Sequence, residues 1–185
     1  IVRTYDSVVE KEFIAAASKA AKENRARHEL AVMRDMHAYI AVRGANNVFE
    51  MASIDGQTVT EYKQIMKPVL RYRVDHTKWC VTRWPNAAMA QEAKMSTESF
   101  ENFYFDACLV DYKQMAKDAQ PLVDLMNKTK KVRIVAPGTD LSFSIEGLPA
   151  IPCCGEKNIP DGEVYTAPVK DSVNGRISYN TPTVY

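Results

Sequence analysis

Helical and strand-like patterns alternate along the chain as far as Val135, and helical periodicity then disappears after Pro137. Before that point, apolar residues recur at helical spacing in several segments, and short apolar runs separate those segments. This order predicts an α/β fold in which helices cover a mostly parallel sheet. After Pro137, alternating apolar and polar residues with turn signals predict β-structure. We therefore expect an α/β domain over residues 1–137 and the β-rich start of a second, catalytic domain over residues 138–185.

The helices of the first part are predicted from N-cap residues and apolar spacing. The expected caps are Asp6 or Ser7, Ser96 and Asp111. A second helix is expected over residues 27–35. A third covers residues 59–70, and we expect Pro68 to kink or divide it because proline cannot donate a helical hydrogen bond.

The strands are predicted from short apolar or alternating runs. Residues 38–42 are nearly all apolar, which predicts a central strand covered on both faces. Further strands are expected over residues 77–84, 131–135 and 141–145. Asn174-Gly175 is typical of a type I′ hairpin turn, and we expect a hairpin there that closes on the segment 178–182.

The composition excludes several classes of partner. The chain has 185 residues, of which 46% are hydrophobic and 25% charged, so it is long enough to bury a core. Its 24 basic and 23 acidic residues give a net charge of +1, which offers no electrostatic basis for binding nucleic acid or an anionic membrane. No apolar stretch approaches the ~20 residues of a membrane span. We expect neither nucleic acid nor membrane as a partner.

The cysteines indicate a reducing compartment. Cys80, Cys108, Cys153 and Cys154 show no C-x-x-C spacing, and the only close pair is vicinal. Because a vicinal disulfide is strained, we expect these residues to be small buried hydrophobes and the protein to be cytoplasmic.

Neither end of the chain looks natural. The chain begins at Ile1 without a methionine, and residues 1–5 read as the end of a strand. We therefore expect a fragment that has been cut at both ends.

Common catalytic motifs do not occur in the sequence. The run from His28 to Val32 begins like a zinc-protease helix but ends in valine where the second histidine would stand. The other histidines, His37 and His76, form no pair with metal-ligand spacing. Nucleotide-binding glycine motifs and the serine-hydrolase elbow are likewise missing.

Glu163 is the one candidate metal ligand. It lies between a Pro-Asp-Gly turn and a short apolar run, where Gly162 permits close backbone approach and Pro160 and Pro168 stiffen the flanks. A carboxylate held on rigid backbone suits a divalent cation. An acidic residue beside such a turn can equally be a simple turn residue, and the residues alone leave both interpretations open.

The segment around Glu163 resembles the first metal-ligand segment of the aminopeptidase T, AmpS and PepS family of metallo-aminopeptidases. The similarity covers most of residues 28–185. Besides residues 158–168, it is carried by residues 36–40, 77–79, 89–91, 95–105, 125–129 and 138–145.

The resemblance implies a cytoplasmic metallopeptidase, an exopeptidase that hydrolyses N-terminal residues from peptide substrates with a two-metal centre of zinc, cobalt or magnesium. Glu163 matches a metal ligand of that family. The family's other ligands belong to sequence beyond Tyr185, so the resemblance implies a fragment that is inactive alone and binds no metal. The resemblance assigns no residue of this chain as the general base or as any other catalytic residue.

The resemblance also implies that the first helix and strand of the α/β domain precede Ile1. A sheet that lacks a strand exposes pairing groups, and the family forms dimers, so we expect a homodimer. An alternative function is a structural, dimerisation or substrate-gating domain without chemistry of its own.

Overall fold

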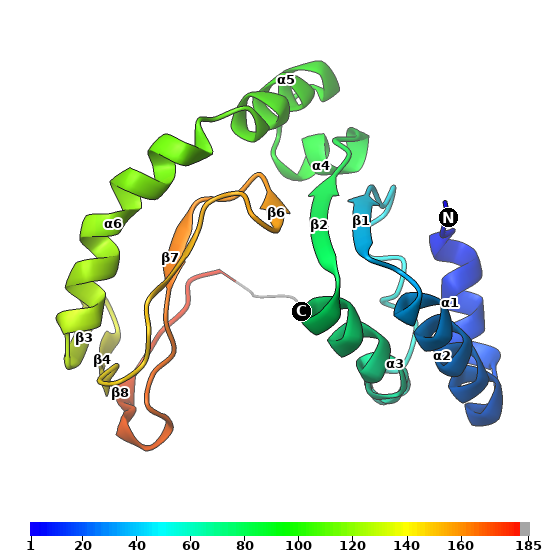
Figure 1. The fold of residues 1–185 in the computed structure, drawn as a ribbon, viewed down its shortest axis with the longest axis horizontal. Helices are drawn as coiled ribbons and strands as arrows, with labels where there is room; N and C mark the ends of the chain where they lie inside the picture. Colours follow the sequence, from blue (N-terminus) through cyan, green and yellow to red (C-terminus); the bar gives the residue numbers. More distant parts are fainter. Residues whose placement is uncertain (182–185) are drawn as a thin grey trace. The chain divides into compact units, whose positions relative to one another are not determined.

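The computed structural model describes residues 1–181 and confirms a mixed helix and strand fold of the α/β class (Figure 1). The chain forms two compact units. Unit 1 contains Ile1–Cys108 and Lys157–Ile159, and the described part of unit 2 contains Leu109–Glu156 and residues 160–181. The domain boundary near residue 137 stays a prediction. Within residues 1–181, none of the helices has the length and apolar character that a membrane crossing requires.

Unit 1 is built on a parallel sheet with strand order β1-β2-β6. Its strands are β1 (Ala38–Arg43), β2 (Lys78–Arg83) and β6 (Asn158–Ile159). Its helices are α1 (Ser7–Ala16), α2 (Lys19–Arg34), α3 (Gly56–His76), α4 (Ala87–Glu92) and α5 (Thr97–Cys108). β1 and β2 pair from Ala38–Lys78 to Arg43–Arg83, which confirms the predicted parallel arrangement.

Capping explains where the first helices begin. The Asp6 carboxylate accepts hydrogen bonds from the Val8 and Val9 amides at 2.8 and 3.0 Å, which confirms the predicted start of α1. α2 begins earlier than predicted, because Ser18 caps it. Of the two predicted effects of Pro68, division of the helix is wrong, because α3 runs as one helix through it, and a kink stays a prediction.

The interpretation of β1 as a central strand is also wrong. β1 lies at the edge of its sheet, and Ile40 and Val42 are 74% and 61% exposed. Only the opposite face is half-buried, where Tyr39 packs against the core cluster of Ala26, Met33 and Val69. The apolar run 38–42 therefore does not form a strand that is buried on both faces of the sheet.

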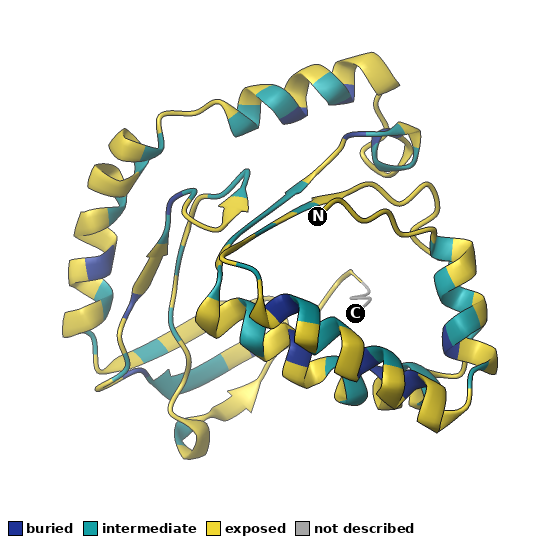
Figure 2. Ribbon diagram, turned by 45° about the vertical axis from the view of Figure 1, so that its right-hand side comes forward, coloured by how far each residue is buried: buried dark blue, intermediate teal, exposed yellow. Residues whose placement is uncertain are grey.

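The buried residues are few and lie mainly along helices and around turns (Figure 2). In unit 1, a second core cluster contains Ala90, Phe100 and Tyr104. The Tyr104 hydroxyl accepts a hydrogen bond from the Arg83 amide at 2.9 Å and donates one to the Ile159 carbonyl oxygen at 3.3 Å. One buried phenol thus joins the ends of β2 and β6.

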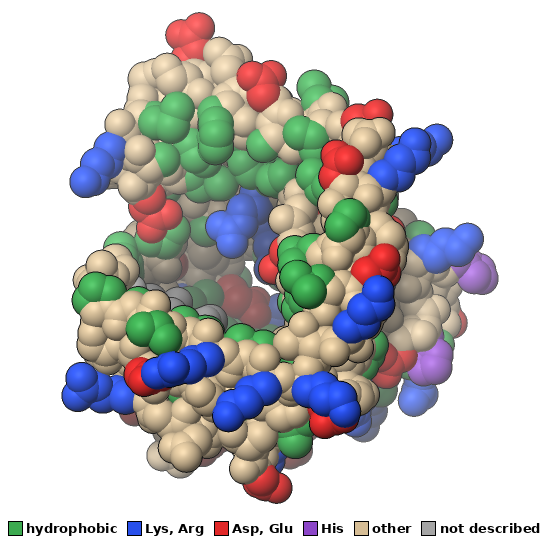
Figure 3. Space-filling view, turned by 90° about the vertical axis from the view of Figure 1, so that its left-hand side faces the viewer, with side chains coloured by type: hydrophobic (Ala, Val, Ile, Leu, Met, Phe, Trp, Pro, Cys, Tyr) green, Lys and Arg blue, Asp and Glu red, His purple; other side chains and the backbone are tan. Residues whose placement is uncertain are grey.

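Unit 2 contains one long helix and short antiparallel strands. Its elements are α6 (Tyr112–Lys128), β3 (Lys131–Ala136), β4 (Thr139–Ser144), β5 (Ile151–Cys153), β7 (Glu163–Tyr165), the 3₁₀ turn η1 (Lys170–Ser172) and β8 (Asn174–Arg176). One sheet has the order β3-β4-β8, and β5 pairs with β7 in another. Hydrophobic side chains, green in Figure 3, reach the surface between basic and acidic ones.

The predicted hairpin turn at Asn174-Gly175 is wrong. Both residues belong to β8, which pairs with β4 through Leu141 and Gly175. A Cβ atom at Gly175 would lie 2.1 Å from the Asp140 carbonyl oxygen, so the glycine permits close strand contact. The predicted closing segment 178–182 ends at Pro182, which lies outside the described residues.

Tyr104→Phe should lower the free energy of unfolding by about 1–2 kcal/mol, because the Arg83 amide would lose its acceptor. Urea denaturation measures the change. Tyr179→Phe is the matched control, since Tyr179 is 74% exposed. Equal stability of the Tyr104→Phe variant and the wild type would show that the bridge contributes nothing.

Candidate functional site

Glu163 is the first residue of β7, in unit 2. β7 pairs antiparallel with β5, and Glu163 lies opposite Cys153 in that register. The Glu163 side chain is exposed and takes part in no hydrogen bond or ion pair among residues 1–181. Both of its carboxylate oxygens are therefore available to a ligand.

The backbone beside Glu163 lies against a side chain of α6. Gly162 has a φ of +146°, a conformation that L side chains rarely adopt. A Cβ atom at this position would lie 3.3 Å from Cε and 3.4 Å from Sδ of Met115. Gly162 thus lies close to the Met115 side chain of α6, whereas a close approach of its backbone to a bound metal stays a prediction.

A second glycine lies in the turn between β5 and β6. Gly155 has a φ of +88°, and a Cβ atom there would lie 2.7 Å from the ring of Tyr112. Tyr112 and Met115 are three residues apart in α6, so they project from one face of the helix. One helix face therefore contacts the chain on both sides of the loop that leads to Glu163.

Two other carboxylates near this loop bind backbone amides. An Asp161 oxygen accepts a hydrogen bond from the Gly155 amide at 2.9 Å, and a Glu156 oxygen accepts one from the Cys154 amide at 2.8 Å. These contacts stabilise the turn. Glu163 differs because no such contact engages it.

The neighbouring thiols are poor nucleophiles. Burial, followed by the Asp161 and Glu163 carboxylates, raises the pKa of Cys153. Burial, followed by Glu156 and Asp161, raises the pKa of Cys154. Both residues are free thiols. Because the thiolate is the reactive and metal-binding form, neither thiol is activated for chemistry at neutral pH.

The described residues do not form a complete metal centre. Within residues 1–181, no group of three or more His, Cys, Asp or Glu side chains is placed to hold a metal ion. The three histidines belong to unit 1, whereas Glu163 belongs to unit 2. The arrangement fits a single carboxylate ligand, and a complete centre needs further donors.

Sequence reasoning identified Glu163 and Gly162 but missed the supporting role of Gly155, Asp161 and Glu156. The signal for Gly155 was weak, since one glycine after two cysteines has many interpretations. The amide contacts of the two carboxylates depend on the loop conformation, which the sequence does not specify.

The comparisons with known proteins give one result. The family model described as "Thermophilic metalloprotease (M29)" matches residues 1–185. A search of curated proteins found no match.

Alanine at Gly155 and at Gly147 should separate backbone strain from steric contact. Both glycines have positive φ, but a Cβ atom at Gly147 would have no neighbour within 4 Å. We expect Gly147→Ala to cost about 1–2 kcal/mol from backbone strain alone. Gly155→Ala should cost at least about 1 kcal/mol more because of the Tyr112 ring.

Urea denaturation of both variants measures the difference. Equal losses would contradict a tight contact between α6 and the turn.

Proposed function

The chain belongs to the thermophilic metalloprotease (M29) family, and from this membership we propose that it serves an aminopeptidase that removes N-terminal residues from peptides at a two-metal centre. The family match confirms the resemblance found in the sequence. It identifies the protein as a metallopeptidase, a hydrolase that acts on peptides with a divalent metal. The aminopeptidase specificity and the two metals are the proposal.

The free carboxylate of Glu163 is the observation that supports this proposal best. It lies on a strand whose backbone is paired with β5 and whose preceding glycine contacts Met115. A ligand held on fixed backbone loses little entropy when a metal binds. We assign Glu163 as one metal ligand.

The chemistry that such a centre supplies is well defined. Zinc, cobalt or magnesium held there would supply a Lewis acid that polarises the scissile carbonyl and lowers the pKa of a bound water. Glu163 supplies an anionic oxygen ligand and balances part of the metal charge. The general base stays unassigned.

We further propose that residues 1–185 alone hydrolyse no peptide. One carboxylate cannot hold two metals, and residues 1–181 bring no set of three donors together. The other donors must come from groups that these residues do not bring to Glu163.

The cysteines support a cytoplasmic location. All four are free thiols, and Cys154 is buried. Unpaired cysteines are usual in reducing compartments.

The exposed edge of unit 1 favours a second candidate function, a dimerisation domain. β1 has no described neighbour on its outer side, and its Ile40 and Val42 side chains share one exposed face. Two copies of such an edge can pair antiparallel around a two-fold axis. This role is compatible with the peptidase function.

Glu163→Gln should reduce bound metal and peptide hydrolysis together in the form of the protein that holds metal. The loss of the anionic ligand should lower metal affinity at least about tenfold. Metal per chain is measured by atomic emission, and turnover by aminoacyl p-nitroanilide hydrolysis with chelator controls.

Glu146→Gln is the matched control. It also removes a carboxylate from unit 2, but that carboxylate is already paired with Lys130. Full metal content in Glu163→Gln would refute the ligand assignment. Hydrolysis by metal-treated residues 1–185 above the chelator control would refute the proposed inactivity.

Ile40→Lys and Val42→Lys should weaken self-association, because charged side chains on an edge strand oppose pairing. Sedimentation velocity over a range of concentrations measures the monomer fraction. Val9→Lys, at a residue of α1 that is 67% exposed, is the control. A wild-type chain that stays monomeric throughout would rule out the dimer.

A further inference from the structure

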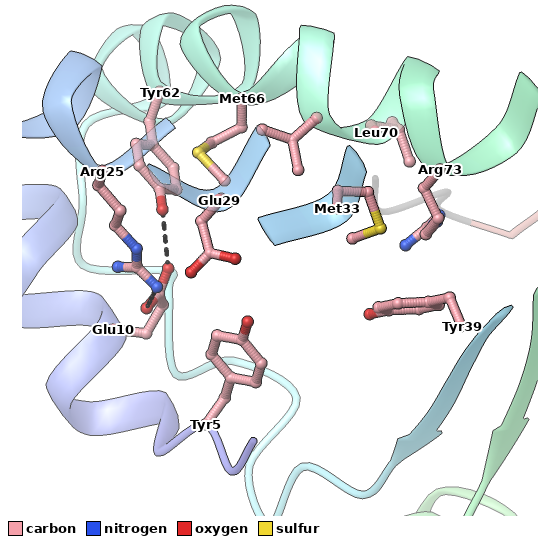
Figure 4. Close-up of a pocket in the computed structure, with 11 residues that line it drawn as sticks. Tyr5, Glu10, Arg25, Glu29, Met33, Tyr39, Tyr62, Met66, Leu70 and Arg73 are labelled. Carbon is pink, nitrogen blue, oxygen red and sulfur yellow. Dashed lines mark hydrogen bonds and ion pairs between the residues drawn. The ribbon is translucent and has the colours of Figure 1, made fainter. Parts of the chain in front are cut away.

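Unit 1 contains a cavity of about 270 Å³ that is separate from the Glu163 segment (Figure 4). Residues of α1, α2, α3 and β1, together with Tyr5, line it. Small-molecule pockets usually measure about 300–1,000 Å³, so this cavity suits a small ligand.

Ion pairs neutralise the charges at one end of the cavity. Arg25 lies 2.8 Å from a Glu10 oxygen, and the Tyr62 hydroxyl donates a hydrogen bond to the other Glu10 oxygen at 3.0 Å. Glu29 pairs with Arg3. Burial, followed by the Glu10 charge, raises the pKa of Tyr62 to about 12, so this phenol stays neutral. This end of the cavity therefore carries no net charge.

Arg73 lies at the other end, without a counter-charge among the described residues. Its guanidinium is 4.8 Å from the centre of the Tyr39 ring and 5.8 Å from that of Trp79. Among residues 1–181, the guanidinium forms no ion pair. Its Nε atom is buried without a hydrogen-bond partner. A buried donor without an acceptor is costly unless a ligand satisfies it.

The wall between the two ends is apolar. Met33, Met66, Val69 and Leu70 line it. In Figure 4 the Arg73 guanidinium lies over the Tyr39 ring at the margin of this wall. An apolar body can therefore lie beside the guanidinium.

We propose that this cavity binds a small molecule with one carboxylate and an apolar body, the carboxylate being held by Arg73. Contact with the Tyr39 and Trp79 rings restrains the guanidinium, and a guanidinium edge matches a planar, bidentate oxyanion. A carboxylate has this planar shape, whereas a tetrahedral phosphate dianion would bring a second negative charge beside Glu10 and Glu29. This binding site is independent of Glu163 and of the peptidase function.

Three probes that each contain six carbon atoms in a straight chain test the proposal: hexanoate, hexanamide and hexyl phosphate. Binding is followed through Trp79 fluorescence in a Trp84→Phe background, because Trp79 contacts Arg73. We expect hexanoate to bind at least about tenfold more tightly than hexanamide, as a charge-assisted bidentate contact requires. Equal binding of these two probes would overturn the proposal. Tighter binding of hexyl phosphate would overturn the assignment to a carboxylate.

Arg73→Met removes the charge and keeps an apolar stem on the Tyr39 ring. It should weaken hexanoate binding at least about tenfold and leave hexanamide binding unchanged. Arg71→Met is the matched control on the same helix, where Arg71 is exposed. Unchanged hexanoate binding in Arg73→Met would overturn the proposal. The probe comparison on the wild-type side chain decides the question if Arg73→Met does not fold.

Discussion

The contact of α6 side chains with two glycines supports the part of unit 2 that carries Glu163. The Tyr112 ring fills the space that a side chain at Gly155 would need, and the end of the Met115 side chain lies close to Gly162. Because tightly packed groups cannot shift without cost, the turn at Gly155 has little freedom beside α6. The Asp161 and Glu156 carboxylates stabilise this turn through hydrogen bonds from backbone amides. Glu163 begins β7, which pairs with β5, and its carboxylate has no partner among the described residues.

Carboxylates of this chain differ in whether a positively charged side chain pairs with them. In unit 1, Glu10 and Glu29 form ion pairs with arginines, and Glu10 also accepts a hydrogen bond from the Tyr62 hydroxyl. In unit 2, Glu163 has no such partner among the described residues. A carboxylate engaged by arginine must give up that ion pair to bind a metal, whereas a free one need not. This difference, with the family membership, favours Glu163.

Local signals predicted the elements well where one residue decides the structure. Asp6 capped α1 as expected. The parallel pairing of β1 and β2 also followed from the order of the elements. Two predictions that depended on tertiary neighbours were wrong. The run 38–42 is apolar but forms an edge strand, and Asn174-Gly175 has the residues of a turn but pairs with β4. Residues between Tyr5 and Arg73 line the Arg73 cavity, and no local sequence pattern predicts that they lie together.

We propose that residues 1–181 offer one preformed ligand, Glu163, and do not by themselves complete a metal centre. Addition of Mn²⁺ to an isotope-labelled sample measures this, since the paramagnetic ion broadens the NMR signals of amides near its binding site. We expect weak binding, with broadening centred on the amides around Glu163. Tight binding, or broadening centred on another part of the chain, would refute the assignment of Glu163.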